Sequence, residues 1–246
     1  VAMAGAGAWQ LSADGWIDAR MDSLSNSIIE ISADAGLRVD EIILSGRQNA
    51  DAAEILAALD IERGAPILGM DMEATRIRLE SIGWIRSAEI ARRLPDVVFV
   101  RVVERQPLAL WQHDGRVTLV DRFGVTIQRS DLDSFGYLPL IVGDGAPAHA
   151  AQLIDLLRTY PAVSDAIEAA VRVSQRRWNL RLRNGIDVRL PEQNISTALT
   201  RLDDFQRKHA LLEHDVVAVA LRVPDRLIVR VGRDSEPRAK SEGKDT

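Results

Sequence analysis

The chain has 246 residues, of which 46% are hydrophobic, so it can bury the core of one large domain or of two modest ones. Its 31 basic and 36 acidic residues leave a net charge of -5 with no dominant block of either sign, which disfavours a nucleic-acid partner. Cysteine is absent, which excludes disulfides, thiolate metal sites and cysteine catalysis.

The two ends of the sequence differ from its middle. The small, apolar opening from Val1 to Trp9 fits the end of a longer hydrophobic segment, although composition alone favours a frayed terminus. No apolar run in the sequence as given reaches about 18 residues, the length of a membrane span. Residues 232–246, which carry no large apolar side chain, are interpreted as a disordered tail.

Residues 37–106 show the order strand, helix, helix, strand, strand. Leu37 to Leu44 is rich in β-branched and aliphatic residues and ends at a Ser-Gly turn. Two segments with apolar residues at helical spacing follow. Trp84 to Arg92 and Val97 to Arg105 flank a Leu-Pro-Asp turn and are expected to pair as an antiparallel hairpin. The pattern predicts a compact α+β module with two helices on one face of a three-stranded sheet.

Residues 107–231 are predicted to form a mostly antiparallel β domain with two helices. Leu108 to Asp121 contains an Asp-Gly pair between β-prone runs, which indicates a hairpin. Trp178 to Leu190 alternates apolar and polar residues around Asn184-Gly185, which predicts a half-buried ribbon with a type I′ turn. An apolar stripe from Ile195 to about His209 predicts a helix.

The last predicted strand pair, Val216 to Val223 and Arg226 to Val231, ends at the tail. If the sheet is laid down sequentially, the final strand is an edge whose backbone N–H and C=O groups invite another chain to pair. Arg226 and Arg230 alternate there with apolar residues. From this pattern alone the arginines are read more readily as gatekeepers against aggregation. The alternative is a docking site for an added strand, with the arginines selecting an acidic partner.

Catalytic and metal-binding motifs are not found in the sequence. It has no phosphate loop, dinucleotide fingerprint, nucleophile elbow or zinc-protease motif. His113 and Asp114 lie in a hairpin turn, where neighbouring side chains point apart, so we predict no catalytic residue, no metal ligand and no cofactor. A cell-wall hydrolase or transferase would need paired carboxylates or an activated nucleophile, neither of which is evident. The tryptophans at strand starts, Trp84 and Trp178, are expected to pack in cores.

Several sequence blocks resemble a known family. They are LSGR at 44–47, IGWIRSA at 82–88, RRLPD at 92–96, ERQPLALW at 104–111, LVDRFG at 119–124, LPLIVG at 138–143, RRWNL at 176–180, LP at 190–191 and LRVPDRL at 221–227. In this order, over roughly residues 36–231, they resemble the POTRA module, the junction and the β domain of the FtsQ/DivIB cell division family, in the form typical of α-proteobacteria.

Three positions depart from that family pattern. Gly83 stands where the family often has Pro, which keeps a helix stop but changes its stiffness. Ala220 stands where many relatives carry Asp, so a hydrogen bond from that carboxylate is absent. Val223 stands where some relatives carry an aromatic residue that contributes to partner binding, so the resemblance implies a weaker or differently shaped contact there.

The resemblance implies a single-pass type II protein of the inner membrane, with this region in the periplasm at the division septum and residues 1–36 as its membrane-proximal segment. Such proteins join FtsB and FtsL and connect early division proteins to septal peptidoglycan synthesis, without catalysis. FtsB adds a strand to the last β-strand, and Arg222 resembles the arginine that pairs with an acidic residue of FtsB. The implied partner-binding residues are Arg222, Val223, Leu227, Ile228, Val229, Arg230 and Val231.

The POTRA module resembles a second recruitment surface for other division proteins. The alternative reading is a POTRA-bearing component of envelope transport or outer-membrane assembly. Against it, the sequence contains one POTRA-like block and no series of barrel strands after it.

Overall fold

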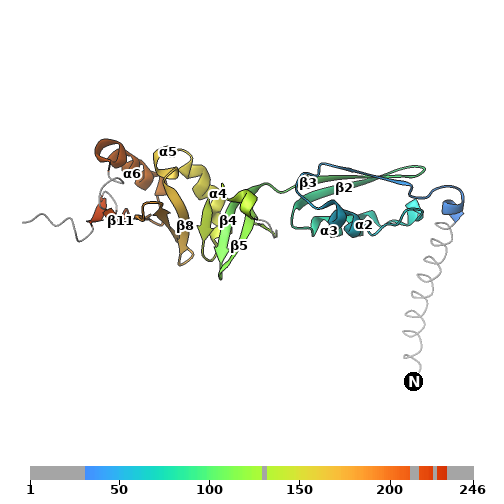
Figure 1. The fold of residues 1–246 in the computed structure, drawn as a ribbon, viewed down its shortest axis with the longest axis horizontal. Coiled ribbons are helices and arrows are strands. Elements are labelled where there is room, and N and C mark those ends of the chain that lie inside the picture. Colours follow the sequence, from blue (N-terminus) through green and yellow to red (C-terminus); the bar gives the residue numbers. More distant parts are fainter. Residues whose placement is uncertain (1–30, 129–131, 211–215, 224–225, 232–246) are drawn as a thin grey trace, which may run out of the picture. The chain divides into compact units, whose positions relative to one another are not determined.

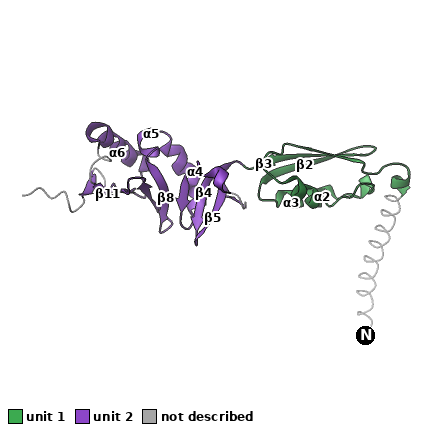
Figure 2. Cartoon of the chain, in the orientation of Figure 1, with its two compact units in different colours: residues 1–105 green, residues 106–246 purple. Residues whose placement is uncertain are grey.

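The computed structural model describes residues 31–128, 132–210, 216–223 and 226–231. The chain divides into two compact units, residues 1–105 and 106–246 (Figures 1 and 2). The expectations for the apolar opening, for the Pro-Asp turn at 224–225 and for the tail at 232–246 lie outside the described residues. In the described part of the chain, no helix has the length and apolar character needed to cross a bilayer.

Unit 1 has the predicted strand, helix, helix, strand, strand order around a three-stranded sheet of order β1-β3-β2. Strand β3 pairs in parallel with β1 and antiparallel with β2. The elements are β1 (Glu41–Ser45), α2 (Ala52–Leu59), the 3-10 turn η1 (Ile67–Gly69), α3 (Met72–Glu80), β2 (Ile85–Arg93) and β3 (Val97–Glu104).

The first strand of unit 1 starts later than predicted. The sequence pattern placed its start at Leu37, but β1 begins at Glu41. The amide N–H of Val39 donates to Ala65 O at 2.9 Å, and that of Ile67 donates to Leu37 O at 3.1 Å. The backbone of residues 37–39 is therefore hydrogen-bonded to the loop after α2 and does not join the sheet.

Unit 2 contains a nine-stranded mixed sheet of order β12-β11-β10-β9-β8-β7-β4-β5-β6. The pairs β4–β7, β7–β8 and β10–β11 are parallel and the other neighbours are antiparallel. The strands are β4 (Pro107–His113), β5 (Arg116–Asp121), β6 (Thr126–Ile127), β7 (Leu140–Val142), β8 (Ile167–Val173), β9 (Arg177–Leu182), β10 (Asp187–Arg189), β11 (Val216–Ala220) and β12 (Ile228–Val231). The helices are α4 (Ala146–Leu157), the single-turn α5 (Pro161–Ser164) and α6 (Ile195–His209), with a 3-10 turn, η2 (Asp133–Phe135).

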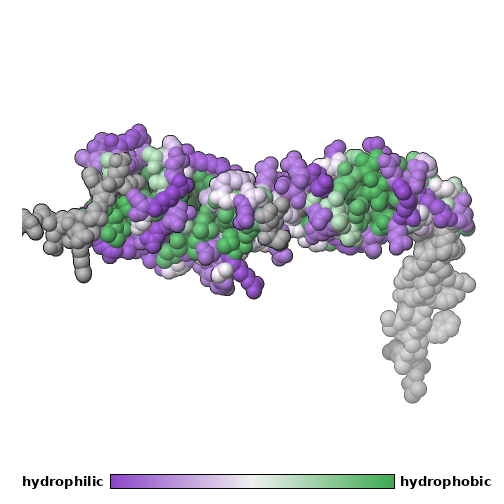
Figure 3. Space-filling view, viewed as in Figure 1, coloured by the Kyte–Doolittle hydropathy of each residue, from purple (hydrophilic) through white to green (hydrophobic). Residues whose placement is uncertain are grey.

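The core of unit 2 lies between one face of this sheet and its helices. Trp178, Leu180 and Leu182 of β9 are buried in one cluster with α4 and α6 residues, while Asn179 and Arg181 alternate onto the other face. We call these the helical face and the open face of the sheet. Figure 3 shows apolar surface within both units among hydrophilic side chains. The predicted alternation along β9 is confirmed, and so is the α+β class, with a strand-helix-helix-strand-strand module before a mostly β domain.

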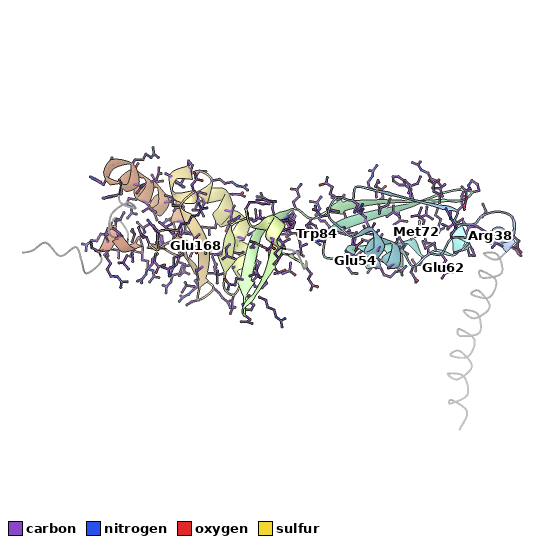
Figure 4. The ribbon with its side chains drawn as sticks, in the orientation of Figure 1. Arg38, Glu54, Glu62, Met72, Trp84 and Glu168 are labelled. Carbon is purple, nitrogen blue, oxygen red and sulfur yellow. The ribbon has the colours of Figure 1, made fainter. Side chains whose placement is uncertain are left out.

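The tryptophans predicted to serve core packing do so. Trp84, labelled in Figure 4, is 5% exposed and Trp178 is 2% exposed. The predicted type I′ turn after β9 is wrong, because Gly185 has a positive φ of 85° and Asn184 does not. The Leu182 N–H donates to Ile186 O, and the Gly185 N–H donates to Leu182 O, both at 2.9 Å. The loop therefore has three residues, with glycine at the left-handed position.

Candidate docking edge

Strand β12 lies at one end of the nine-stranded sheet, as expected for the last strand. It pairs antiparallel with β11, with Ile228 opposite Ala220, Val229 opposite Val219 and Arg230 opposite Ala218. Among the described strands, β11 is its one neighbour. The outer side of β12 is therefore the edge where a further strand could add.

The two faces of β12 differ in character. Val229 lies opposite the buried Val219 on the helical face, and Leu227 packs against the unit 2 core just before the strand. Ile228 and Arg230 lie on the open face, where Ile228 is 51% exposed. Val231 at the strand end is 52% exposed. An added strand would therefore extend the core on one side and meet an isoleucine and an arginine on the other.

Arg222 follows β11 and lies near two further arginines on the open face. Its Nη2 donates to Asn179 Oδ1 at 3.5 Å. Partial burial, and then the charges of Arg177 and Arg189, lower the pKa of Arg222 from its ordinary value. The structure thus gathers three guanidinium groups on the open face, from β9, β10 and the segment after β11, which we call the arginine cluster (Arg177, Arg189 and Arg222).

Sequence reasoning missed part of this cluster. No local sequence pattern links Arg177 to Arg189 or to Arg222. They come together because β9 and β10 pair with Asn179 opposite Arg189, and β11 then joins β10 in parallel with Arg189 opposite Ala220. Val223, also predicted for partner binding, is 42% exposed beside Arg222.

The chemistry available at this edge is recognition of a peptide. A strand edge supplies backbone donors and acceptors, and clustered guanidinium groups bind carboxylates. On β10, the carboxylate of Asp187 already forms an ion pair with Arg181 at 3.1 Å. The Asp187 carboxylate therefore competes little with an acidic partner residue for the arginine cluster.

Elsewhere, the imidazole of His113 lies 3.1 Å from an Asp144 carboxylate oxygen and 3.4 Å from one of Asp114. This contact was not expected from the turn position of the His-Asp pair. The imidazole also stacks on Trp111, with ring centroids 5.1 Å apart. In the described residues no group of three or more His, Cys, Asp or Glu is arranged to hold a metal ion.

Two family models match almost the whole described chain. Residues 37–105 match the POTRA domain of FtsQ type, and residues 109–222 match the C-terminal region of cell division protein FtsQ/DivIB. The chain belongs to the FtsQ/DivIB family of cell division proteins. The second match ends at Arg222, so β12 lies beyond it.

Curated relatives agree with this assignment. The chain is 34% identical over 223 residues to cell division protein FtsQ of Bradyrhizobium diazoefficiens, covering 91% of this chain and 65% of the relative. It is 35% identical to FtsQ of Caulobacter vibrioides, covering 85% of this chain and 69% of the relative. FtsQ of Rickettsia prowazekii is 33% identical, with 81% of this chain and 74% of that protein covered. The chain thus spans about two thirds of the length of these relatives.

Among solved structures, the major extracytoplasmic domain of the cell division protein DivIB from Geobacillus stearothermophilus is similar to part of the chain. The match covers 44% of this chain and 96% of that one, at 14% sequence identity and a TM-score of 0.30. Agreement at this level carries no argument, so the family assignment rests on the sequence matches.

Proposed function

We propose that this chain is the periplasmic region of a septal scaffold that is anchored in the inner membrane by a single span. It binds FtsB, together with FtsL, by strand addition at β12, and it catalyses no reaction. This role links early division proteins to septal peptidoglycan synthesis. The observation that carries the proposal is an edge strand, β12, preceded in the sheet order by the three strands β9 to β11 that, with the segment after β11, supply the arginine cluster.

The edge supports the proposal through its geometry. A strand added outside β12 gains main-chain hydrogen bonds along four residues and covers the half-exposed Ile228 and Val231. Its alternate side chains face Leu227 and Val229 on the helical face, where the unit 2 core continues. Apolar residues at every second position of the partner strand would therefore be buried.

The arginine cluster supports an acidic partner residue. Arg177 and Arg189 lower the pKa of Arg222 because like charges near one another disfavour the charged form. A partner carboxylate next to Arg222 relieves this repulsion and accepts charge-assisted hydrogen bonds. The seven predicted partner-binding residues, Arg222, Val223, Leu227, Ile228, Val229, Arg230 and Val231, then act together with Arg177 and Arg189.

The test is calorimetric binding of an FtsB extracytoplasmic peptide to the chain, with FtsL present in a second arm. Arg222→Glu places like charges against each other and is expected to weaken binding by about 50-fold, corresponding to about 2–3 kcal/mol. The matched control is Arg116→Glu on β5, which makes the same charge change at the opposite end of the sheet order. A peptide with its acidic residues changed to lysine is expected to bind Arg222→Glu better than it binds the unchanged chain.

The backbone contribution is tested at Ile228. Ile228→Pro removes a donor and fixes φ, whereas Ile228→Thr keeps a β-branched side chain and the N–H. We expect the proline variant to lose strand binding while the threonine variant keeps most of it, with circular dichroism checking that both fold. Absence of binding by the folded, unchanged chain both with and without FtsL would refute the docking role.

The alternative class is a POTRA-bearing transport or assembly component. Membership of a cell division family and the curated FtsQ relatives favour the scaffold. The POTRA unit is proposed as a further recruitment surface for other division proteins.

A further inference from the structure

A second cationic site lies on the helical side of unit 2, away from the β12 edge. It is a surface pocket of about 530 Å³ between α4, the turn joining β8 to β9, and the start of α6. Its polar lining includes His149, Gln152, Arg172, Arg176, Glu192 and Asn194. Nothing in the proposed strand docking uses these residues.

Arg172 lines this pocket, and its surroundings hold its side chain in place. Its guanidinium carbon lies 5.1 Å from the centroid of the buried Trp178 ring, and its Nη2 donates to Gln175 O at 3.0 Å. Within the described residues, its Nε is buried with no hydrogen-bond partner. The side chain is thus fixed in place by the Trp178 ring and the Gln175 carbonyl.

The electrostatic balance of the pocket is positive. Arg176 adds a second guanidinium at the rim, and its Nη1 lies 4.0 Å from the Glu192 carboxylate. Both of those side chains are more than half exposed, so their attraction is weak and a ligand can displace it. Partial burial and the charge of Arg172 lower the pKa of His149, as expected beside a positively charged group. His149 is then neutral at neutral pH and can donate one N–H.

We propose that this pocket binds a small oxyanion, either a carboxylate or a phosphate group. Arg172 and Arg176 supply the charge, and the side chains of Gln152 and Asn194 supply neutral donors. The volume exceeds that of a single phosphate, so the group is expected to be part of a larger ligand.

The test is NMR titration of the whole chain with inorganic phosphate, against chloride at matched ionic strength. Saturable shifts are expected at the amides of His149, Arg172 and Arg176. Arg176→Gln is expected to weaken binding about tenfold, which corresponds to the loss of one charge-assisted contact. Arg116→Gln removes an exposed arginine of β5 and should leave the affinity unchanged.

Further titrations separate the sources of the anion. Acetate tests for a carboxylate ligand, methyl phosphate for a soluble phosphate ester, and vesicles with anionic phospholipid for a lipid headgroup. Binding of any of these probes supports the site if Arg176→Gln weakens that binding. Arg172→Lys keeps the positive charge and is expected to retain measurable binding. This variant separates the loss of a charge from a loss of folding. Shifts that grow linearly without saturation, or equal weakening by Arg116→Gln, would overturn the proposal.

Discussion

The two units each contain a strand with an unpaired edge, and they treat it differently. In unit 1, β2 is nine residues long, and its Ala88 N–H donates to Glu80 Oε1 at 3.1 Å. Arg92 Nη2 donates to Met70 O near the other end of the same strand. In unit 2, β12 is four residues long, and the described residues include no side chain bonded to its backbone.

The difference shows how one chain can protect one edge and leave another available. Glu80 is itself held by Arg76, whose Nη1 lies 2.5 Å from Glu80 Oε2, so the carboxylate stays over β2. A side chain that occupies an outward N–H removes a donor that a foreign strand would need. The longer edge of unit 1 is thus partly occupied by its own helix, and the shorter edge of unit 2 is the better docking position.

The largest expected effect tests whether the two edges belong to independent units. Gly46 follows β1 with φ of +85°, and a Cβ built there would lie 2.0 Å from Val102 O. Gly46→Ala must therefore shift the backbone and is expected to destabilise unit 1 by about 3–5 kcal/mol. Strand-peptide binding at β12 is expected to survive, as measured by calorimetry beside denaturant unfolding of the whole chain.

Gly64→Ala is the matched control for this change. Gly64 has nearly the same φ, +89°, but a Cβ there meets nothing within 4 Å. Only the cost of a left-handed residue remains, about 1–2 kcal/mol. Equal destabilisation by both variants would show that the close approach to Val102 does not matter, and loss of peptide binding by Gly46→Ala alone would show that the units are coupled.

The second prediction concerns the loop that follows β1. One carboxylate, that of Glu104, accepts the backbone N–H groups of Gln48, Asn49 and Ala50 at 2.7–2.8 Å. Glu104→Gln is expected to lower the free energy of unfolding by about 1–2 kcal/mol, because a neutral acceptor replaces a charged one. The loss is no larger because solvent screens the partly exposed carboxylate. The control is Glu89→Gln, whose carboxylate is 70% exposed and 3.7 Å from Arg101, with an expected cost under about 0.5 kcal/mol.

The same carboxylate makes a prediction about pH. Burial alone would raise the pKa of Glu104, but the hydrogen bonds from Ala50, Gln48 and Asn49 outweigh it and lower the pKa below the ordinary 4.5. A depressed folded-state pKa contributes stability that is complete above the unfolded value and is lost as pH falls through the folded one. The difference in unfolding free energy between the unchanged chain and Glu104→Gln should therefore be constant near neutrality and shrink in acid. A difference that persists at the lowest pH contradicts this origin.

Local patterns predicted much of the fold. The alternation along β9 and the Asp-Gly pair between β4 and β5 concern residues close in sequence, and both gave the observed hairpins. Helix α4 was not located from the sequence, although its buried residues Ala146, Ala150, Leu153, Ile154 and Leu157 recur at helical spacing. The start of β1 was also not predictable from local sequence, because it depends on hydrogen bonds to a distant part of the backbone.

The candidate site divides in the same way. The edge position of β12 followed from its place as the last strand before the tail. The arginine cluster did not, because Arg189 and Arg222 come together through the parallel pairing of β10 with β11 across α6. That pairing joins segments separated by a helix, and no periodicity within either segment encodes it.

The third prediction tests the occupied edge directly. Glu80→Ala removes the acceptor of the Ala88 N–H, and we expect amide exchange at Ala88 to accelerate about tenfold, for the loss of about 1.4 kcal/mol of local protection. Glu73→Ala is the control, because Glu73 also pairs with Arg76 at 2.5 Å yet is not bonded to β2. Hydrogen exchange measured by NMR separates the two. Equal rates at Ala88 in both variants would mean that Glu80 does not protect the edge.

The smallest effect decides what Arg230 does on the open face of β12. If it selects an acidic partner, Arg230→Gln should weaken the strand peptide a few-fold at low salt, and the difference should vanish near 1 M salt, where the Debye length falls to about 3 Å. Arg183→Gln, an exposed arginine in the loop after β9, serves as the charge-matched control. If Arg230 is instead a gatekeeper, peptide affinity will not change and light scattering will reveal self-association of the variant. The two roles also predict different behaviour of the unbound variant. If Arg230 selects a partner, the Arg230→Gln chain stays monomeric; if Arg230 is a gatekeeper, that chain self-associates.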